Sequence, residues 1–168
     1  MHIYRLLVGF LCALMLTACG FHSRGVQKLS PALNPLLVST SDPNGADALS
    51  LKRALRAEHV IIVTDPSLAK ATLVIKDRGS SQQLNSLTGA SEAGQYRLTS
   101  TLTFSVLDKD GKTLVPLTTL STSRLYNTNA MQVLSQETVQ KRLNTQMTQE
   151  LNARLINRLA AIKPEKSQ

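Results

Sequence analysis

Aromatic residues are scarce in this chain of 168 residues, and tryptophan is absent. Phenylalanine and tyrosine together make up 4% of the sequence. Surfaces that bind single-stranded nucleic acid need aromatic platforms on which bases stack, so we expect no nucleic-acid partner despite a formal net charge of +8. Cysteine is rarer still. The sequence has only Cys12 and Cys19, which are too few for a disulfide framework.

The sequence also lacks a run of about 20 apolar residues, the length that a membrane-spanning helix requires. Its N-terminal apolar stretch, Leu6 to Leu16, follows the basic residue Arg5 and has the length of a signal-peptide core. The stretch closes on small residues directly before Cys19, a pattern that resembles a bacterial lipobox. We therefore predict that residues 1–18 are a signal peptide that is cleaved.

Cys19 is the predicted lipid anchor. Its thiol can carry a diacylglyceryl group, and the amine that cleavage frees can take a third acyl chain. Two acyl chains already hold a protein stably on a membrane, so three make release negligible. The alternative is an ordinary cleaved signal peptide with an incidental cysteine. Gly20, rather than aspartate, follows Cys19, which implies sorting to the outer membrane and a lipid-anchored position on its periplasmic face. Lipid phosphates are the partners expected for a basic protein there.

Hydrophobic periodicity predicts a single α+β domain over residues 36–163. A lipidated tether at 19–35 precedes it and a polar tail at 164–168 follows. Strand patterns occur near residues 36–40, 60–63, 71–87, 96–108 and 114–126. Helical patterns begin at Asp47 and Ser135, which we expect to cap their helices. The element order favours a two-layer sandwich, in which a mostly antiparallel four-stranded sheet carries two helices on one face.

The strand at 96–108 has the clearest alternation in the chain. Leu98, Leu102, Phe104 and Val106 fall on one face, which predicts the core side. Small hydroxyl side chains fall on the other face, and the predicted partner strand is also rich in threonine and serine. An antiparallel sheet that buries one side leaves the other side free. We therefore predict an uncharged interface, suited to lying against another protein wall, at Thr99, Thr101 and Thr103.

The C-terminal helix carries apolar residues at intervals of four, from Val139 to Leu159. At 3.6 residues per turn this spacing drifts by about 40° at each step, or about 200° over five steps. The two ends of the stripe therefore cannot face the same sheet surface unless the helix bends. We expect the first half of the helix to pack on the sheet and its end to face something else.

Catalytic and metal-binding motifs are not found in the sequence. Beyond the predicted signal peptide the only histidines are His22 and His59, which are far apart in the chain, so no metal site or cofactor is expected. There is no nucleophile elbow, phosphate-binding glycine loop or paired-carboxylate signature. We therefore predict that the protein is not an enzyme.

Basic residues sit in pairs beside apolar stripes, as at Lys76 and Arg78 and at Lys141 and Arg142. One interpretation is that these pairs are simply solvated faces. The other is that one of them binds lipid phosphates, because charge-assisted contacts from arginine and lysine to phosphate are strong.

The segment from Cys19 to Gly25 (CGFHSRG) resembles the mature start of the LptE family of lipopolysaccharide-assembly lipoproteins. Later features agree in order: the Asp42–Gly45 turn, Tyr96 at the start of the long strand, the Asp110–Gly111 turn, and Arg124 and Tyr126 ahead of the final helix. The resemblance implies an outer-membrane lipoprotein that sits as a plug inside the LptD β-barrel. It further implies that the protein assists assembly of that barrel, binds lipopolysaccharide directly, and helps deliver it to the outer leaflet.

The resemblance is weaker for the lipopolysaccharide contacts. The family uses basic residues near the middle hairpin tip and ahead of the last helix, where this sequence has Leu87 to Gly89 and Gln136. The basic residues nearby, which could substitute, are Arg78, Arg97, Lys141 and Arg142. The alternative function is a free-standing outer-membrane lipoprotein that binds a small molecule or an envelope polymer without a barrel partner. That function needs a concave apolar pocket.

Overall fold

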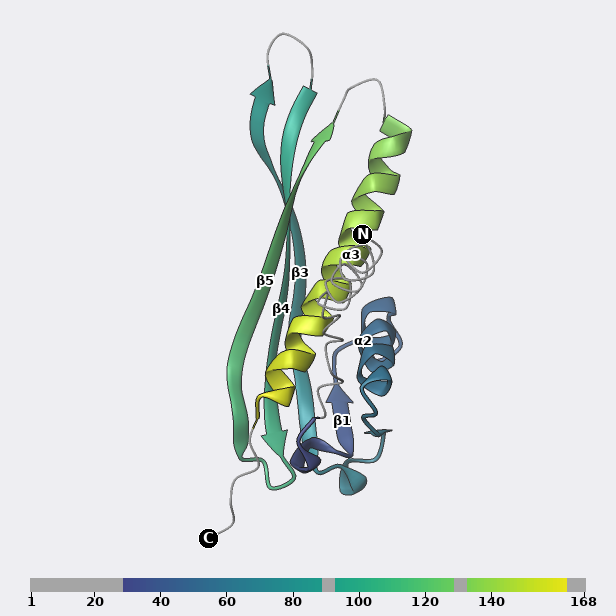
Figure 1. Ribbon diagram of the computed structural model, residues 1–168, viewed down its shortest axis with the longest axis vertical. Helices are drawn as coiled ribbons and strands as arrows, with labels where there is room; N and C mark the ends of the chain where they lie inside the picture. The colour runs from purple at the N-terminus through teal and green to yellow at the C-terminus, as the bar shows by residue number, and fades with distance from the viewer. Residues whose placement is uncertain (1–28, 89–92, 129–132, 163–168) are drawn as a thin grey trace, which may run out of the picture.

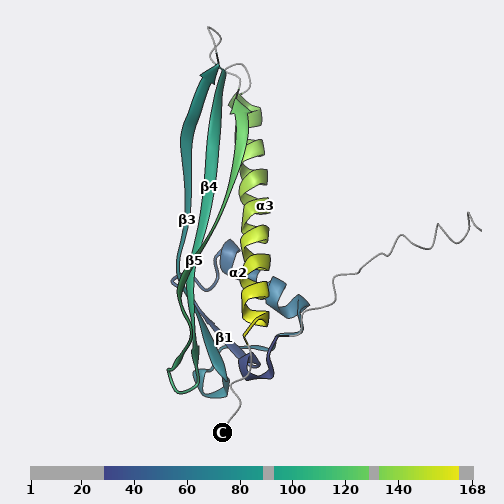
Figure 2. The same ribbon diagram turned by 60° about the vertical axis from the view of Figure 1, so that its left-hand side comes forward.

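The computed structural model describes residues 29–88, 93–128 and 133–162, which form one five-stranded sheet with two α-helices on one face (Figures 1 and 2). The strands are β1 (Leu36–Ser39), β2 (Ile62–Val63), β3 (Ala71–Thr88), β4 (Ala93–Asp108) and β5 (Thr113–Thr128). The helices are α2 (Ala46–Ala57) and α3 (Val133–Ala160), with short 3-10 turns η1 (Pro31–Leu33) and η2 (Pro66–Leu68). This confirms the α+β class.

The sheet has the order β2-β1-β3-β4-β5. β1 lies parallel to both β2 and β3, whereas β3, β4 and β5 form a long antiparallel meander. The predicted sheet of four strands is one strand too small, because the strand pattern near 60–63 also joins the sheet, as the two-residue β2 at the edge of β1. The prediction that most of the sheet is antiparallel is confirmed.

The side chains of β4 alternate between buried and more exposed positions, as the sequence pattern predicts. Leu98, Leu102, Phe104 and Val106 are buried toward the helices, with Ser100 buried among them. The intervening residues face away from the helices, because successive side chains of a strand point to opposite sides of the sheet. The central strand of the meander therefore has an apolar face inside and a polar face outside.

The turn between β4 and β5 is stabilised by local chemistry. Gly111 has a φ of +80° in the β4–β5 turn, a conformation that glycine adopts without steric cost. The Asp108 carboxylate accepts from the backbone N–H groups of Asp110 and Lys112, both at 2.8 Å. Pro116 lies on the outer strand β5, next to a shift in the β4–β5 register. A residue without an N–H group is tolerated at such positions. The middle hairpin tip near Leu87 to Gly89 lies partly outside the described residues.

The predicted helix caps are wrong in detail. Gly45 is the N-cap of α2, and Asp47 lies in its first turn, where a carboxylate still complements the helix dipole. α3 begins at Val133, so Ser135 is inside the helix rather than at its cap. The buried residues Ala48, Leu51 and Leu55 confirm the apolar stripe of α2.

The prediction that the first half of α3 packs on the sheet and its end faces something else is wrong. Val139 is 43% exposed, whereas Met147, Leu151, Leu155 and Leu159 are essentially buried. The late half therefore packs into the core, because β1 and α2 lie only at the lower end of the long sheet and close the core there (Figures 1 and 2). The early half lies beside the meander and is separated from α2 by a hollow, so its stripe is less well covered.

The end of the predicted tether packs onto the domain. Residues 31–33 form η1, and Leu33 is fully buried in the same core cluster as Leu36 and Phe104. Ser30 caps this turn by accepting from the N–H of Ala32. Cys19 and most of the tether lie outside the described residues.

Candidate functional site

The outer face of the meander is a sheet of small hydroxyl side chains, here called the hydroxyl face. Strand register places these residues side by side on the side away from α3, in three rows: Ser81 with Thr99 and Ser123, Thr101 with Ser121, and Thr103 with Thr119. The Thr103 and Thr119 hydroxyl oxygens are 2.9 Å apart. The structure thus brings all three predicted interface threonines onto one free surface.

Gly79 completes the hydroxyl face opposite Thr101. A Cβ atom at this position would lie 2.8 Å from the Thr101 Oγ1 atom, closer than real contacts allow. Asp77 borders the face at one end and Arg97 at the other. The centre therefore has no charged group to desolvate when another surface covers it.

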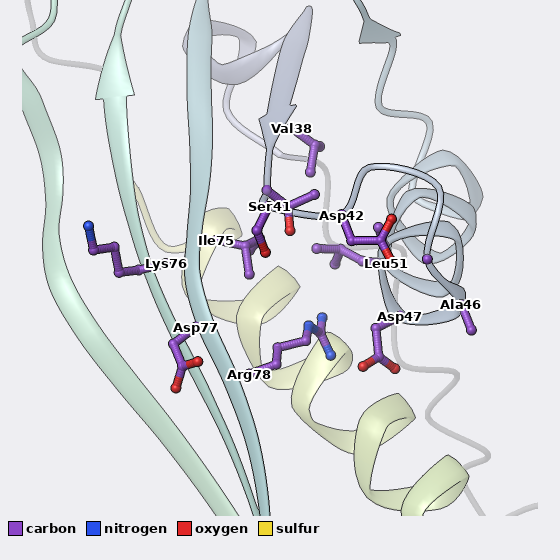
Figure 3. Close-up of a pocket in the computed structure, with 13 residues that line it drawn as sticks. Val38, Ser41, Asp42, Ala46, Asp47, Leu51, Ile75, Lys76, Asp77 and Arg78 are labelled. Atoms are coloured by element: carbon purple, nitrogen blue, oxygen red, sulfur yellow. The ribbon is translucent and has the colours of Figure 1, made fainter.

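Arg78 points the opposite way, toward α2 and α3. Figure 3 shows its side chain directed at Asp47, while Lys76 extends to the other side of β3. Its Nη2 atom donates to Asn152 Oδ1 at 2.7 Å, and Asn152 Nδ2 donates to Ser50 Oγ at 3.3 Å. This chain of hydrogen bonds ties β3 to both helices.

Burial lowers the pKa of Arg78 from its usual value, and the nearby charge of Asp47 acts in the opposite direction. Arg78 forms no ion pair among the described residues. Asn152, which is 2% exposed, is therefore its main hydrogen-bond partner. The geometry gives Arg78 a structural role, in addition to the predicted contact with lipid phosphate.

Replacing Asn152 by alanine is expected to lower the free energy of unfolding by about 2 kcal/mol, because it leaves a partly buried guanidinium without its acceptor. Urea denaturation measures the loss. In an Arg78→Met background the same substitution should cost at least about 1 kcal/mol less, since the donor is gone. Asn157→Ala, an exposed change on the same helix, is the matched control. Equal losses at Asn152 in both backgrounds would contradict the coupling.

The four predicted lipid-binding residues do not form one patch. Arg97 lies on the outer side of β4, where its Nη2 atom donates to Asn85 Oδ1 at 3.0 Å. Lys141 and Arg142 are exposed on α3. Arg78, Arg97 and the α3 pair therefore occupy three different surfaces of the molecule.

A cluster that sequence reasoning missed joins α3 to β5. Glu150 accepts from Arg124 Nη2 through Oε2 and from Arg154 Nη2 through Oε1, both at 2.6 Å. Thr122 Oγ1 also donates to Glu150 Oε2, at 3.1 Å. The spacing of four between Glu150 and Arg154 was a visible signal of a helical ion pair. Nothing in the sequence indicated that Arg124, far away in the chain, completes the cluster.

The hollows between α2 and its neighbours have linings that are polar and apolar in about equal parts. One of about 800 Å³ lies between α2 and α3 and is lined by residues such as Arg53, Gln140, Lys141 and Asn144. A hollow of about 320 Å³ lies between α2 and β3 and includes Arg78 (Figure 3). Within the described ranges no three His, Cys, Asp or Glu side chains are placed to hold a metal, and no helix is long and apolar enough to span a membrane.

Solved structures with this fold are bacterial lipoproteins. A minor lipoprotein of Acinetobacter baumannii is similar with a TM-score of 0.64 and 21% identity, over 81% of this chain and 97% of its own. A lipoprotein B of Nitrosomonas europaea is similar with a TM-score of 0.71 and 17% identity, over 84% of this chain and 91% of its own. These likenesses concern the fold. The fold of this chain is thus one that these two bacterial lipoproteins share.

The sequence comparisons are more specific. The family model LptE, described as lipopolysaccharide-assembly, matches residues 33–159, and the chain belongs to this family. An LPS-assembly lipoprotein LptE of Photorhabdus laumondii is 28% identical over 160 residues, which are 95% of this chain and 86% of that protein. Another, of Yersinia pestis, is 29% identical over 161 residues, covering 95% of this chain and 76% of that protein. The protein is therefore an envelope lipoprotein with a role in lipopolysaccharide assembly, in a family of assembly factors rather than enzymes.

Proposed function

We propose that this protein is anchored by Cys19 to the periplasmic face of the outer membrane and fills the LptD β-barrel as a plug. It assists assembly of that barrel, and together the two proteins deliver lipopolysaccharide to the outer leaflet. Family membership supports the general role. In the chain itself residues 1–18 are a signal peptide, 19–35 link the anchor to the domain at 36–163, and 164–168 are a polar tail.

The hydroxyl face is the observation that carries the barrel partnership. Thr99, Thr101 and Thr103 lie on a long strand surface whose centre is uncharged and which no described element covers. The inner wall of a membrane barrel is polar, so a plug must bring polar rather than apolar groups against it. Hydroxyl groups act as both donors and acceptors, which lets such a face adapt to either kind of partner group.

Direct binding of lipopolysaccharide is the second part of the proposal. Arg97, Lys141 and Arg142 are exposed, and none forms an ion pair among the described residues. They are thus available for charge-assisted contacts with lipid phosphates. Arg78 is the weakest of the four candidates, because Asn152 already engages its guanidinium.

Co-purification tests the partnership directly. The chain is tagged after Gln168, outer membranes are extracted in mild detergent, and the proteins that co-purify are identified by mass. A stoichiometric large β-barrel supports the plug. A lone chain would contradict it and favour the free-standing lipoprotein that binds a small molecule or envelope polymer.

Thr101→Asp is expected to reduce barrel co-purification by at least about tenfold, because a carboxylate without a partner is costly to bury in an interface. Folding should change little, since the side chain faces away from the core. The readouts are the barrel-to-chain ratio and the urea midpoint of the chain. Thr138→Asp, on the exposed side of α3, is the control. Unchanged co-purification of Thr101→Asp would remove the hydroxyl face from the interface.

A further inference from the structure

β5 is the outer strand of the sheet on the side away from β1 (Figure 1). Alternate residues of an edge strand point their backbone N–H and C=O groups outward, where they can pair with a strand of another molecule. Ser121 and Ser123 are two such residues in β5, because their carbonyl groups accept hydrogen bonds from arginine side chains. The middle of this edge is therefore occupied, although no strand is paired to it.

The side chains that occupy the edge are held by a single carboxylate. Arg154 Nη1 donates to Ser121 O, and Arg124 Nη1 donates to Ser123 O, both at 3.0 Å. The other terminal nitrogen of each arginine is bound to Glu150. This Glu150 clamp, formed by Glu150, Arg124 and Arg154, aims two cations at neighbouring outward carbonyl groups. Covering an edge with charged side chains is a common defence against unwanted strand pairing.

The sequence of β5 shows which partner the edge would fit. Leu117 and Leu125 are 64% and 49% exposed, and each lies four residues from Ser121. Two copies of β5 that pair antiparallel about Ser121 place Leu117 of each copy opposite Leu125 of the other. Thr119 of each copy then faces Ser123 of the other. The side of the strand that carries Leu117, Thr119, Ser123 and Leu125 therefore brings no like charges together. Apolar cross-strand pairs stabilise such a ribbon.

We propose that the outer edge of β5 is a docking surface for a second copy of this chain, in register about Ser121, and that the Glu150 clamp opposes this docking by occupying the middle of the edge. The clamp covers the centre of the self-complementary stretch, which is where pairing between two copies would begin. Pro116 and the adjacent register shift limit the pairing to residues 117–125. This proposal does not rest on the barrel partnership or on lipid binding.

The test uses the full-length chain with a reporter cysteine, Ser121→Cys, purified from envelopes in mild detergent. The clamp contacts the backbone carbonyl of Ser121, so the side-chain change leaves it intact. Adding Arg154→Ala frees that carbonyl and should raise the yield of disulfide-linked dimer by about tenfold, the effect of removing one charge-assisted hydrogen bond. Arg158→Ala removes the same charge one turn later on α3 and should leave the yield unchanged. The parent chain measures any crosslinking through its native cysteines.

Register separates specific pairing from general association. In the predicted ribbon Ser123 faces Thr119 of the other copy, so Ser123→Cys with Arg154→Ala should give little dimer. Equal yields from the two reporter positions would overturn the proposal, as would a Ser121→Cys, Arg154→Ala chain that stays monomeric. Far-UV circular dichroism checks folding. If Arg154→Ala unfolds the chain, Arg154→Met takes its place, because it keeps the apolar stem but has no donor.

Discussion

Cys19→Ala is expected to move the protein from the membrane fraction to the soluble fraction of the envelope almost completely, while the domain stays folded. Without the thiol no diacylglyceryl group can be attached. In the described part of the chain, none of the helices is long and apolar enough to span a membrane. The free energy of unfolding should not change, since the buried core cluster of the described residues consists of Leu33 and later positions, well beyond the substituted one.

Fractionation after carbonate extraction measures the release, and thermal unfolding checks the fold. Cys12→Ala is the matched control, because it removes a cysteine inside the predicted signal peptide and should leave the protein in the membrane. Retention of the Cys19→Ala protein as an integral component would contradict the anchor. If the wild-type chain were itself released in its mature form and carried no acyl mass, the alternative of an ordinary signal peptide with an incidental cysteine would be favoured.

Phe104→Ala is expected to lower the free energy of unfolding by about 3–5 kcal/mol, the usual cost of removing a large buried aromatic side chain. Phe104 is fully buried where the sheet meets the late half of α3, in the same cluster as Leu73, Leu151 and Leu155. The cavity left behind cannot collapse easily, because rigid strands surround it on both sides. A loss of this size is a large fraction of the stability of a small domain.

Equilibrium denaturation in urea measures this loss, provided that the slope of the transition stays the same. Thr103→Ala is the control on the adjacent residue of β4. It removes the hydroxyl contact with Thr119 on the outer face and should cost less than about 1 kcal/mol. Equal losses from the two substitutions would contradict the expected large contribution of the buried Phe104 ring.

The central strand of the sheet could be predicted because its pattern is local. In β4 the alternation of Leu98, Leu102, Phe104 and Val106 with hydroxyl residues fixes which side is buried, whatever packs on it. The turn at Gly111 follows from the same kind of local chemistry, since a positive φ is strained for other residues. The side of the sheet that carries Thr99, Thr101 and Thr103 was predictable for this reason.

The burial of α3 could not be predicted, because its stripe winds around the helix and does not indicate which half meets the core. The position of β1 and α2 decides this, and they close the core over Leu151, Leu155 and Leu159. Val139 has the same spacing as these residues and remains 43% exposed. Periodicity gives a helix its apolar stripe, but neighbouring elements decide which part of it is covered.

The sequence by itself determined the α+β class and the hydroxyl-rich outer face of β4 at Thr99, Thr101 and Thr103, and it predicts the anchor at Cys19. Each of these rests on residues that are close together in the chain or that follow a strict period. Only the tertiary structure decided the partners of the charged groups. Arg78 meets Asn152 and Arg124 meets Glu150 across long stretches of sequence, because the meander and α3 run side by side. Such pairs depend on the packing of whole elements, and local patterns carry no record of that packing.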